Sequence, residues 1–365
     1  MDGLTFYLFW GPLGLAFVIS LLVTWVTIKL AYRLKIVDDP AKHVHVKVVH
    51  TYPVPRGGGV PIFVALLFGL LSFLEVDQHV LGVLLGALVA VVVGLVDDRY
   101  DISPWWRLGT NVLSALIVVA VGIGIAYVSN PLGDGVIDLS FWQWNFFALG
   151  EWRSIWVLSD LFALIWIVAL MNVIGQGAGG IEGQFPGVVA IGAIVVALLS
   201  LESSADVTQW PVIILAAVTA GAYLGFLPWN FFPQKIMPGY SGKSLAGYLL
   251  AVMTILSTAK VGMVLVVLGV PILDAAYSYV RRIKAGKSPL WGDRGHLHHR
   301  LLDAGWSKPQ VVYFYWGVTA LLGAIALHLN STQKLYAFLG VGLGMGVLLL
   351  MLPMGKREKG SRRKQ

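Results

Sequence analysis

Three histidines lie close together in the stretch WGDRGHLHHRLLDAG. They are His296, His298 and His299, with Arg294 and Arg300 on either side of them. A zinc site would need further ligands, but the chain has no cysteine and no obvious partner histidine on a nearby helix face. Histidines between arginines can instead bind an anion such as a diphosphate and exchange a proton near neutral pH. The alternative, a solvated loop, explains the arginines well but the histidines poorly.

A second group of chemically active residues is acidic. The segment GLVDDRYDISPWWR places Asp97, Asp98 and Asp101 at the end of a long apolar stretch. If a helix continued through them, Asp101 would share a face with each of the other two, and such carboxylates repel one another unless a cation lies among them. Mg²⁺ binds through one or two carboxylates together with substrate phosphates. The segment therefore indicates a magnesium site at a membrane surface, with a solvated helix end as the alternative.

Several basic and glycine-rich segments could bind phosphate groups. One has a basic run followed by three consecutive glycines, whose amides can contact an anion, although tight helix packing would also require glycine. Another, MNVIGQGAGGIEGQFPG, has Glu182 as its only charge. A third carries two lysines, of which Lys235 alone is explained by ordinary loop charge. The residues of interest in these segments are Lys42, His50, Arg56, Gly57, Gly58, Gly59, Lys235 and Lys243.

One acid lies deep in an apolar stretch. Asp274 follows Pro271 in VPILDAAYSY. An ionisable residue inside a membrane helix is a functional hypothesis by default, and the proline favours a broken or kinked helix. A transporter is a distant alternative, because it predicts several such charges and symmetry between the two halves. The sequence shows essentially one deep acid and no internal repeat.

The elements that must position these residues are membrane helices. Hydrophobic residues make up 57% of the 365 residues and charged residues only 12%, which is typical of an all-α polytopic membrane protein. Apolar runs predict about eleven transmembrane helices. Their approximate ranges are 8–31, 58–75, 79–96, 108–128, 156–174, 186–201, 210–228, 244–259, 261–280, 311–328 and 335–353.

The distribution of positive charge predicts the orientation. Segments on one side of these spans hold 22 of the 26 lysines and arginines, and the positive-inside rule makes that side cytoplasmic. The N-terminus is then outside, the C-terminus is cytoplasmic, and every polar cluster lies on the cytoplasmic side. The net charge of +7 reflects this topology and contact with anionic membrane lipids rather than nucleic acid. The outer segment 129–155 contains Trp142, Trp144 and Trp152, which we interpret as interfacial anchors.

A series of motifs in order resembles the polyprenyl-phosphate N-acetylhexosamine-1-phosphate transferase family, over about residues 30–310. VDDPAKHVH…PVPRGGGV is similar to the family's first cytoplasmic loop, and GLVDDRYD to its paired-aspartate motif. GGIEGQFPG is similar to its Asp-Gly-rich loop, and NFFPQKIMPGYSGKS to its glycine-aspartate segment. PILDAAYSYVRR and DRGHLHHRLL are similar to its ninth helix and histidine motif. Eleven spans with a cytoplasmic tail look more like the O-antigen and teichoic acid enzymes than the ten-span peptidoglycan translocase.

The resemblance implies an enzyme of a bacterial-type cytoplasmic (inner) membrane that starts a cell-envelope polysaccharide. One integral membrane transferase domain would cover 1–355, with a basic, disordered cytoplasmic tail over 356–365. Polyprenyl phosphate would attack the β-phosphorus of a UDP-sugar, giving polyprenyl-diphosphate-sugar and UMP, with Mg²⁺ or Mn²⁺ as cofactor. Asp97 and Asp98 would be catalytic and, with Asp101, would bind the metal. The substrate-binding residues would be Lys42, His50, Arg56, Gly58, Glu182, Lys235, Lys243, Asp293, Arg294, His296, His298 and His299. A homodimer is left open.

Two departures from the family pattern bear on activity. Tyr240 stands where the family places a metal-binding aspartate, and a phenol is neutral at pH 7 and a poor Mg²⁺ ligand. The Asn and Asp positions of another family motif, NxxNxxDG, are largely lost in NVIGQGAGG. Lys243 could replace part of the cation's charge on the diphosphate. We therefore predict a weakly Mg²⁺-dependent enzyme, with a relative that binds its substrates without turnover as the alternative.

Overall fold

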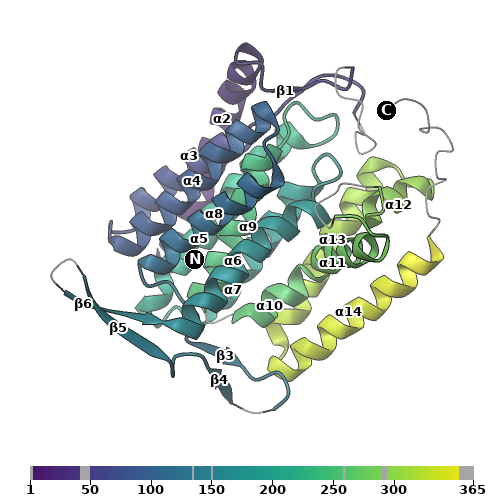
Figure 1. Ribbon diagram of the computed structural model, residues 1–365. Coiled ribbons are helices and arrows are strands. Elements are labelled where there is room, and N and C mark those ends of the chain that lie inside the picture. Colours follow the sequence, from purple (N-terminus) through teal and green to yellow (C-terminus); the bar gives the residue numbers. More distant parts are fainter. Residues whose placement is uncertain are drawn as a thin grey trace.

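A computed structural model describes residues 3–41, 50–133, 135–148, 151–257, 260–288 and 294–352 of the chain. Helices packed side by side dominate it, and they run between two ends of one bundle (Figure 1). One end carries β1 and α12, and we call it the α12 end. The opposite end carries strands β3 to β6, and we call it the hairpin end. The predicted tail 356–365 lies outside the described residues.

The elements follow the apolar runs of the sequence. The helices are α1 (Gly3–Thr5), η1 (Phe6–Trp10), α2 (Gly11–Arg33), α3 (Gly59–Phe73), α4 (Gln78–Tyr100), α5 (Pro104–Ala120), α6 (Val157–Gly177), α7 (Gln184–Glu202), η2 (Val207–Gln209), α8 (Trp210–Asn230), α9 (Gly239–Leu256), α10 (Lys260–Val267), α11 (Gly269–Lys284), α12 (Leu297–Asp303), α13 (Lys308–His328) and α14 (Ser331–Met351). The strands are β1 (Val37–Asp38), β2 (Val54–Pro55), β3 (Tyr127–Ser129), β4 (Val136–Asp138), β5 (Gln143–Ala148) and β6 (Glu151–Trp156).

The prediction of a polytopic helical membrane protein is confirmed. Within the described residues, seven helices are long and apolar enough to cross a membrane, or eight when one bent pair counts as a single span. Each of the eleven predicted ranges contains a helix or a helix pair, but α3 is short for a span, and α5 and α9 do not pass the same test of length and hydropathy. The structure therefore does not confirm the predicted number of eleven spans.

The predicted interruption near Pro271 is present. Helices α10 and α11 meet at an angle of 83° across Leu268. Pro271 lies in the first turn of α11, where its missing N–H costs no helical hydrogen bond. The bend also puts Asp274 within two turns of the start of a new helix.

The described part of segment 129–155, which the sequence predicts to lie outside, is mainly strand rather than helix. Strands β3 and β4 form one antiparallel hairpin, and β5 and β6 form another that projects beyond the bundle (Figure 1). Helix α5 ends at Ala120, so the predicted span 108–128 is too long at its C-terminal end. Trp142 and Trp144 are exposed, as an interfacial position requires, and their anchoring role stays a prediction.

Helices α8 and α9 form the centre of the bundle. Helix α8 packs against α2, α3 and α7, while α9 packs against α4 and α6. Small residues make the second set of contacts close: a side chain at Gly94 of α4 would overlap the backbone of Ser241 at the start of α9. The last turns of α4 and α6 are therefore held beside the first turn of α9, and these three places carry the paired aspartates, the start of the glycine-rich loop and Lys243.

Candidate active site

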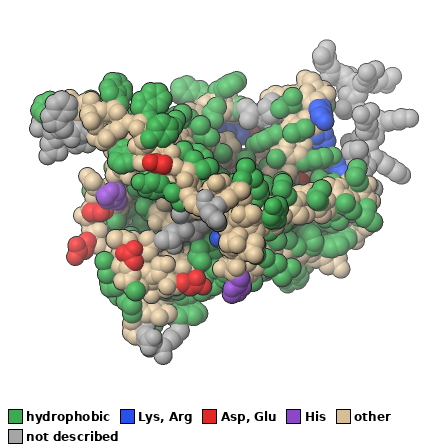
Figure 2. All heavy atoms as spheres, turned by 90° about the horizontal axis from the view of Figure 1, so that it is seen from below, with side chains coloured by type: hydrophobic (Ala, Val, Ile, Leu, Met, Phe, Trp, Pro, Cys, Tyr) green, Lys and Arg blue, Asp and Glu red, His purple; other side chains and the backbone are tan. Residues whose placement is uncertain are grey.

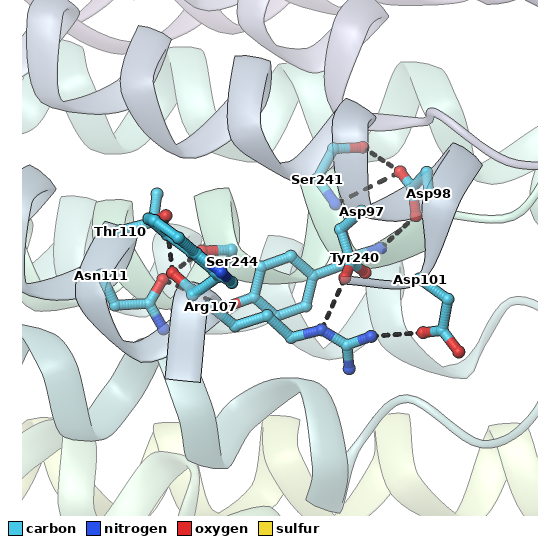
Figure 3. Close-up of polar contacts among 10 residues, drawn as sticks. Asp97, Asp98, Asp101, Arg107, Thr110, Asn111, Tyr240, Ser241 and Ser244 are labelled. Carbon is cyan, nitrogen blue, oxygen red and sulfur yellow. Dashed lines mark hydrogen bonds and ion pairs between the residues drawn. The ribbon is translucent and has the colours of Figure 1, made fainter. Parts of the chain in front are cut away.

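Asp98 lies in the last turn of α4 and caps the start of α9. Its Oδ1 accepts a hydrogen bond from the backbone N–H of Tyr240 at 2.6 Å. Its Oδ2 accepts from the hydroxyl of Ser241 at 2.6 Å and from the Ser241 N–H at 3.3 Å (Figure 3). Gly239 has a φ of +67° and no room for a Cβ, because that atom would overlap the Asp98 carboxylate. Asp98 is thus a buried carboxylate that satisfies the first amides of a helix.

Asp97 points to a different partner. The Arg107 Nε donates a hydrogen bond to Asp97 Oδ1 at 2.6 Å, and the Arg107 Nη2 donates to Asp101 (Figure 3). Helix α4 ends at Tyr100, and Asp101 is its C-cap in the left-handed conformation, with a side chain that is 82% exposed. The shared helical face considered for Asp101 therefore does not form. Arg107 connects the acids instead.

Arg107 was missed by the sequence analysis. It belongs to the first turn of α5, and its guanidinium lies 5.3 Å from the centre of the Tyr240 ring. The available signal was its place one short turn after the acids, in the segment DISPWWR. The spacing alone could not show that the chain folds back there and places the arginine between two carboxylates.

The Tyr240 phenol points away from the acid pair. Its hydroxyl donates to Asn111 Oδ1 at 3.2 Å, and the Ser244 hydroxyl donates to the same oxygen at 3.0 Å (Figure 3). At the position where the family pattern has an aspartate, the protein therefore has an aromatic ring beneath Arg107 and a neutral phenol instead of a carboxylate.

The glycine-rich segment between α6 and α7 contacts the start of α9 through Lys243. The Lys243 ammonium donates to the carbonyl of Gly179 at 3.0 Å. A Cβ at Gly175 would lie 3.0 Å from Lys243 Cβ, and one at Gly179 would lie 2.8 Å from Lys243 Nζ. The glycines thus leave the space that the lysine side chain fills, so a positive charge stands at this point of the loop.

Glu182 has an ion pair of its own. Its carboxylate is buried and lies 2.9 Å from the Lys308 ammonium at the start of α13. The next residue, Gly183, has a φ of +84° and donates its N–H to Asn230 Oδ1 at 3.0 Å. Glu182 therefore ties the loop to α13, which is the contact that the structure gives for this predicted substrate-binding residue.

The histidines are buried, so the solvated-loop alternative is wrong for them. His296 precedes α12 and lies 2.8 Å from Asp274 Oδ2 through Nδ1. The rings of His296 and His298 are stacked with centroids 5.5 Å apart, and His298 lies against Gly180, where a Cβ would overlap its ring. The histidine segment thus packs on the glycine-rich loop, although the two are far apart in the sequence.

The two arginines beside the histidines, Arg294 and Arg300, differ in their exposure to solvent. Arg294 is exposed and pairs with Asp303 at 3.1 Å. Arg300 is buried, and its Nη1 donates to the carbonyl of Leu349 in α14 at 2.7 Å, so a solvated position is wrong for Arg300 as well. Asp293 lies outside the described residues.

The first loop is held by internal contacts. Arg56 forms an ion pair of 2.8 Å with Asp38, and His50 is buried with its Nε2 3.9 Å from the same carboxylate oxygen. Burial lowers the pKa of the Arg56 guanidinium, but the hydrogen bond and charge of Asp38 outweigh burial, so the net direction is upward. Arg56 is therefore a permanent cation. Lys42 lies outside the described residues, and Lys235 is exposed, with its ammonium 5.2 Å from the centre of the Trp229 ring.

Two glycines of this loop pack tightly. Gly58 donates its N–H to the carbonyl of Met237 at 3.2 Å, and Gly59 donates to the Ser241 hydroxyl at 3.3 Å. A Cβ at Gly58 would lie 2.6 Å from the Phe226 ring. The packing interpretation is thus correct for both glycines, and their amides are used inside the protein rather than for an anion.

The predicted motifs therefore meet around the first turn of α9. The acid pair, the first loop and the glycine-rich loop contact it directly, and the histidines join through Gly180. Fold and site together define a multi-pass membrane protein with an acidic, a basic and a glycine-rich element gathered at one end of its helical bundle.

The family model of glycosyl transferase family 4 matches residues 80–258 of the chain, from α4 through the start and body of α9. The chain is similar to the probable undecaprenyl-phosphate N-acetylglucosaminyl 1-phosphate transferase of Bacillus subtilis (strain 168), with 28% identity over 87% of this chain and 84% of that protein. It is also similar to the decaprenyl-phosphate N-acetylglucosaminephosphotransferase of Mycobacterium tuberculosis, with 28% identity over 90% of this chain and 84% of that protein. The undecaprenyl-phosphate alpha-N-acetylglucosaminyl 1-phosphate transferase of Haemophilus influenzae is 26% identical over 82% of this chain and 80% of that protein.

Proposed function

We propose that the protein transfers a sugar-1-phosphate, an N-acetylhexosamine-1-phosphate, from a UDP-sugar to polyprenyl phosphate. The products are polyprenyl-diphosphate-sugar and UMP, and the step begins a cell-envelope polysaccharide such as a teichoic acid or O-antigen. The observation that carries the proposal is the meeting of the acid pair, the Lys243–glycine contact and the histidine segment around one helix start. The relatives, named as transferases of N-acetylglucosamine 1-phosphate to polyprenyl phosphates, support it.

In this reaction an oxygen of the lipid phosphate forms a bond to the β-phosphorus of the UDP-sugar, and the bond between that phosphorus and the UMP oxygen breaks. Lys243 supplies positive charge beside the glycine-rich loop, where a diphosphate can approach the backbone. His298 lies against the same loop, and the centre of the His299 ring lies 4.4 Å from that of the His298 ring, so both are suited to contact the nucleotide-sugar.

Mg²⁺ would neutralise charge on the phosphates when bound. Asp97 is the better placed of the two acids to hold it, because the Asp98 oxygens both accept hydrogen bonds from α9. Among the described residues, no group of three or more His, Asp or Glu side chains converges as a metal site. The donor set therefore fits an ion completed by substrate phosphates and does not fit a site built from protein ligands alone. Asp98 would keep the start of α9 beside this ion.

We also propose the predicted orientation, with the α12 end in the cytoplasm of a bacterial-type cell and the N-terminus outside. The charge distribution supports it, because 22 of the 26 lysines and arginines fall on one side of the predicted spans. The face at the hairpin end shows scattered acidic side chains, with Lys and Arg mainly toward one edge (Figure 2). Reporter fusions at both termini test the orientation, and a reporter active outside the cytoplasm at Gln365 would overturn it.

The function is tested by incubating the purified protein with polyprenyl phosphate and a panel of UDP-sugars, with and without Mg²⁺, and measuring UMP. We expect UMP release that depends on both substrates. The pairing of Asp97 with Arg107 and the presence of Tyr240 favour a second candidate, a relative that binds these substrates without turnover. Binding of UMP or lipid phosphate without any UMP release would support that candidate.

A further inference from the structure

Asp274 is a completely buried acid that the proposed reaction does not use. It lies in α11, one turn beyond Pro271, and its side chain has no exposed surface. Oδ1 accepts a hydrogen bond from the N–H of Leu297 at 2.8 Å, and Oδ2 lies 2.8 Å from His296 Nδ1. One carboxylate therefore holds both the backbone at the start of α12 and the imidazole ring that precedes it.

The other ring nitrogen of His296 fixes its tautomer. His296 Nε2 lies 3.1 Å from Arg282 Nη2, and a guanidinium can only donate hydrogen bonds. Nε2 must therefore be the acceptor, so the proton of the neutral ring is on Nδ1 and is donated to Asp274. The imidazole thus lies between a buried negative charge and a buried positive charge, and each contact requires the other.

This arrangement continues to the glycine-rich loop. Arg282 Nη1 donates to Gln176 Oε1 at 3.3 Å, and Gln176 Nε2 donates to the Tyr279 hydroxyl at 2.7 Å. Gln176 belongs to the last turn of α6, where the loop begins. On the other side, His298 stacks on His296 and rests on Gly180. The position of His298 against the loop therefore depends on the orientation of His296.

We propose that Asp274 and His296 are positioning residues, which hold His298 and the glycine-rich loop in register for the nucleotide part of the substrate. This inference rests on the proposed function, and it removes His296 from the residues that contact the UDP-sugar. Asp274 and His296 would act on nucleotide binding through His298, and they would leave the acid pair at α4 unchanged.

The variant Asp274→Asn tests the tautomer directly. Asparagine keeps an oxygen for the Leu297 N–H, but its amide NH₂ then faces His296 Nδ1, which must become the acceptor. The proton moves to Nε2 and points at the Arg282 donors, so the chain of contacts cannot be satisfied. We expect UMP binding, measured by calorimetry, to weaken by about tenfold or more, which corresponds to about 1.4 kcal/mol. The KM for polyprenyl phosphate should change less than about twofold, because its site lies at the acid pair.

Ser278→Ala is the matched control. Ser278 is equally buried in α11, and its hydroxyl makes the longer contact of 3.3 Å to the same His296 nitrogen. This variant leaves the carboxylate, the imidazole and the guanidinium in place, so UMP affinity should stay close to that of the wild type. A loss as large as that of Asp274→Asn would show a general effect of polar burial and would overturn the inference.

Nitrogen-15 NMR of histidine-labelled protein supplies a readout that does not depend on ligand. The wild type should show the signal of one neutral histidine with its proton on Nδ1. This signal should be absent in His296→Gln, and in Asp274→Asn it should change to that of a ring with the proton on Nε2. Equal UMP affinity in the wild type and Asp274→Asn, or no binding by the wild type, would overturn the inference. A wild type that binds UMP but releases none from UDP-sugars, with the loss in Asp274→Asn, would refute the proposed turnover and support the positioning role.

Discussion

The acid cluster at α4 and the histidine cluster at α12 both combine a carboxylate with an arginine, in direct contact at α4 and through the His296 ring at α12, but the two arginines differ in exposure. Arg107 has a side chain that is 28% exposed, and one of its two carboxylate partners, Asp101, is almost fully solvated. Arg282 is only 2% exposed and contacts His296 and Gln176, and His296 in turn contacts the buried Asp274. One cluster can therefore be opened from solvent and the other cannot.

This difference has a physical consequence for function. The ion pair between Arg107 and Asp97 costs less to separate than a pair with a fully buried arginine, because water can take over the contacts of Arg107, although Asp97 itself is only 5% exposed. A buried chain of charges loses several interactions at once if one member moves, and no water replaces them. We infer that the acid cluster can exchange its arginine for a ligand, whereas the histidine cluster keeps the same arrangement with and without substrate. The predictions below test this contrast.

Asp97→Asn should have the largest effect. Asp97 is the carboxylate whose partner can leave, so the charge it offers is the one a metal and the lipid phosphate would use. We expect UMP release to fall by at least about a hundredfold, with a melting temperature close to that of the wild type. Asp101→Asn, at the exposed partner of the same arginine, should cost much less. Wild-type turnover in Asp97→Asn would remove the acid cluster from the mechanism.

A matched pair of substitutions, Arg282→Lys and Arg107→Lys, compares the two clusters directly. Lysine keeps the charge but cannot make the two directed contacts that Arg282 makes to His296 and Gln176. We expect Arg282→Lys to lower stability by about 2 kcal/mol or more, and Arg107→Lys to change it by about 0.5 kcal/mol at most. Thermal unfolding in detergent measures both. Equal losses would mean that exposure does not separate the clusters.

His298→Ala should raise the KM for UDP-sugar by about tenfold, because it removes a side chain that lines the glycine-rich loop. Gly180→Ala tests the same contact without changing a polar group, since the added methyl would overlap the His298 ring. The two variants should therefore behave alike. Gly192→Ala is a control, because a Cβ there would meet its nearest atoms at an ordinary 3.5 Å. If Gly180→Ala kept a wild-type KM while unfolding normally, His298 would not act at this loop.

The same contrast explains which parts of the site could be predicted from sequence. Asp97, Asp98 and the three histidines stand out because charged and proton-accepting residues are rare in a chain of this hydropathy. Apolar runs also predicted the helical ranges, and the proline at position 271 predicted the break near it. What could not be predicted are contacts that depend on how the chain turns and packs: Arg107 on the acids, Lys243 in the space left by Gly175 and Gly179, and Asp274 on His296.

The errors have similar physical causes. Gly58 and Gly59 were candidates for anion binding because their amides are accessible in an isolated loop, but helix packing assigns those amides to Met237 and Ser241. The segment 121–128 was included in a span because it is apolar, although Gly122 at a φ of +90° ends the helical course after Ala120. Hydropathy records composition, and it does not record where a chain turns.

Tyr240→Asp should have the smallest but most specific effect. The phenol of Tyr240 binds Asn111, and its ring lies beneath Arg107. An aspartate here adds one carboxylate beside the acid cluster, where Arg107 controls the access of Mg²⁺. Half-maximal activity should therefore be reached at a Mg²⁺ concentration several-fold lower than in the wild type. Tyr240→Asn is the matched control, because it makes the same truncation without charge, and its Mg²⁺ titration should not move in that direction. Coincident Mg²⁺ titrations for the Asp and Asn variants would mean that this position lies too far from the ion to matter.

Lys243→Ala should lower activity several-fold at every Mg²⁺ concentration, because the ammonium beside Gly179 supplies charge that the metal does not replace. If the wild type and Tyr240→Asp both show no turnover at any Mg²⁺ concentration with any UDP-sugar, the protein is a relative that binds its substrates without turnover, and the ion pair between Asp97 and the partly exposed Arg107 then stays closed.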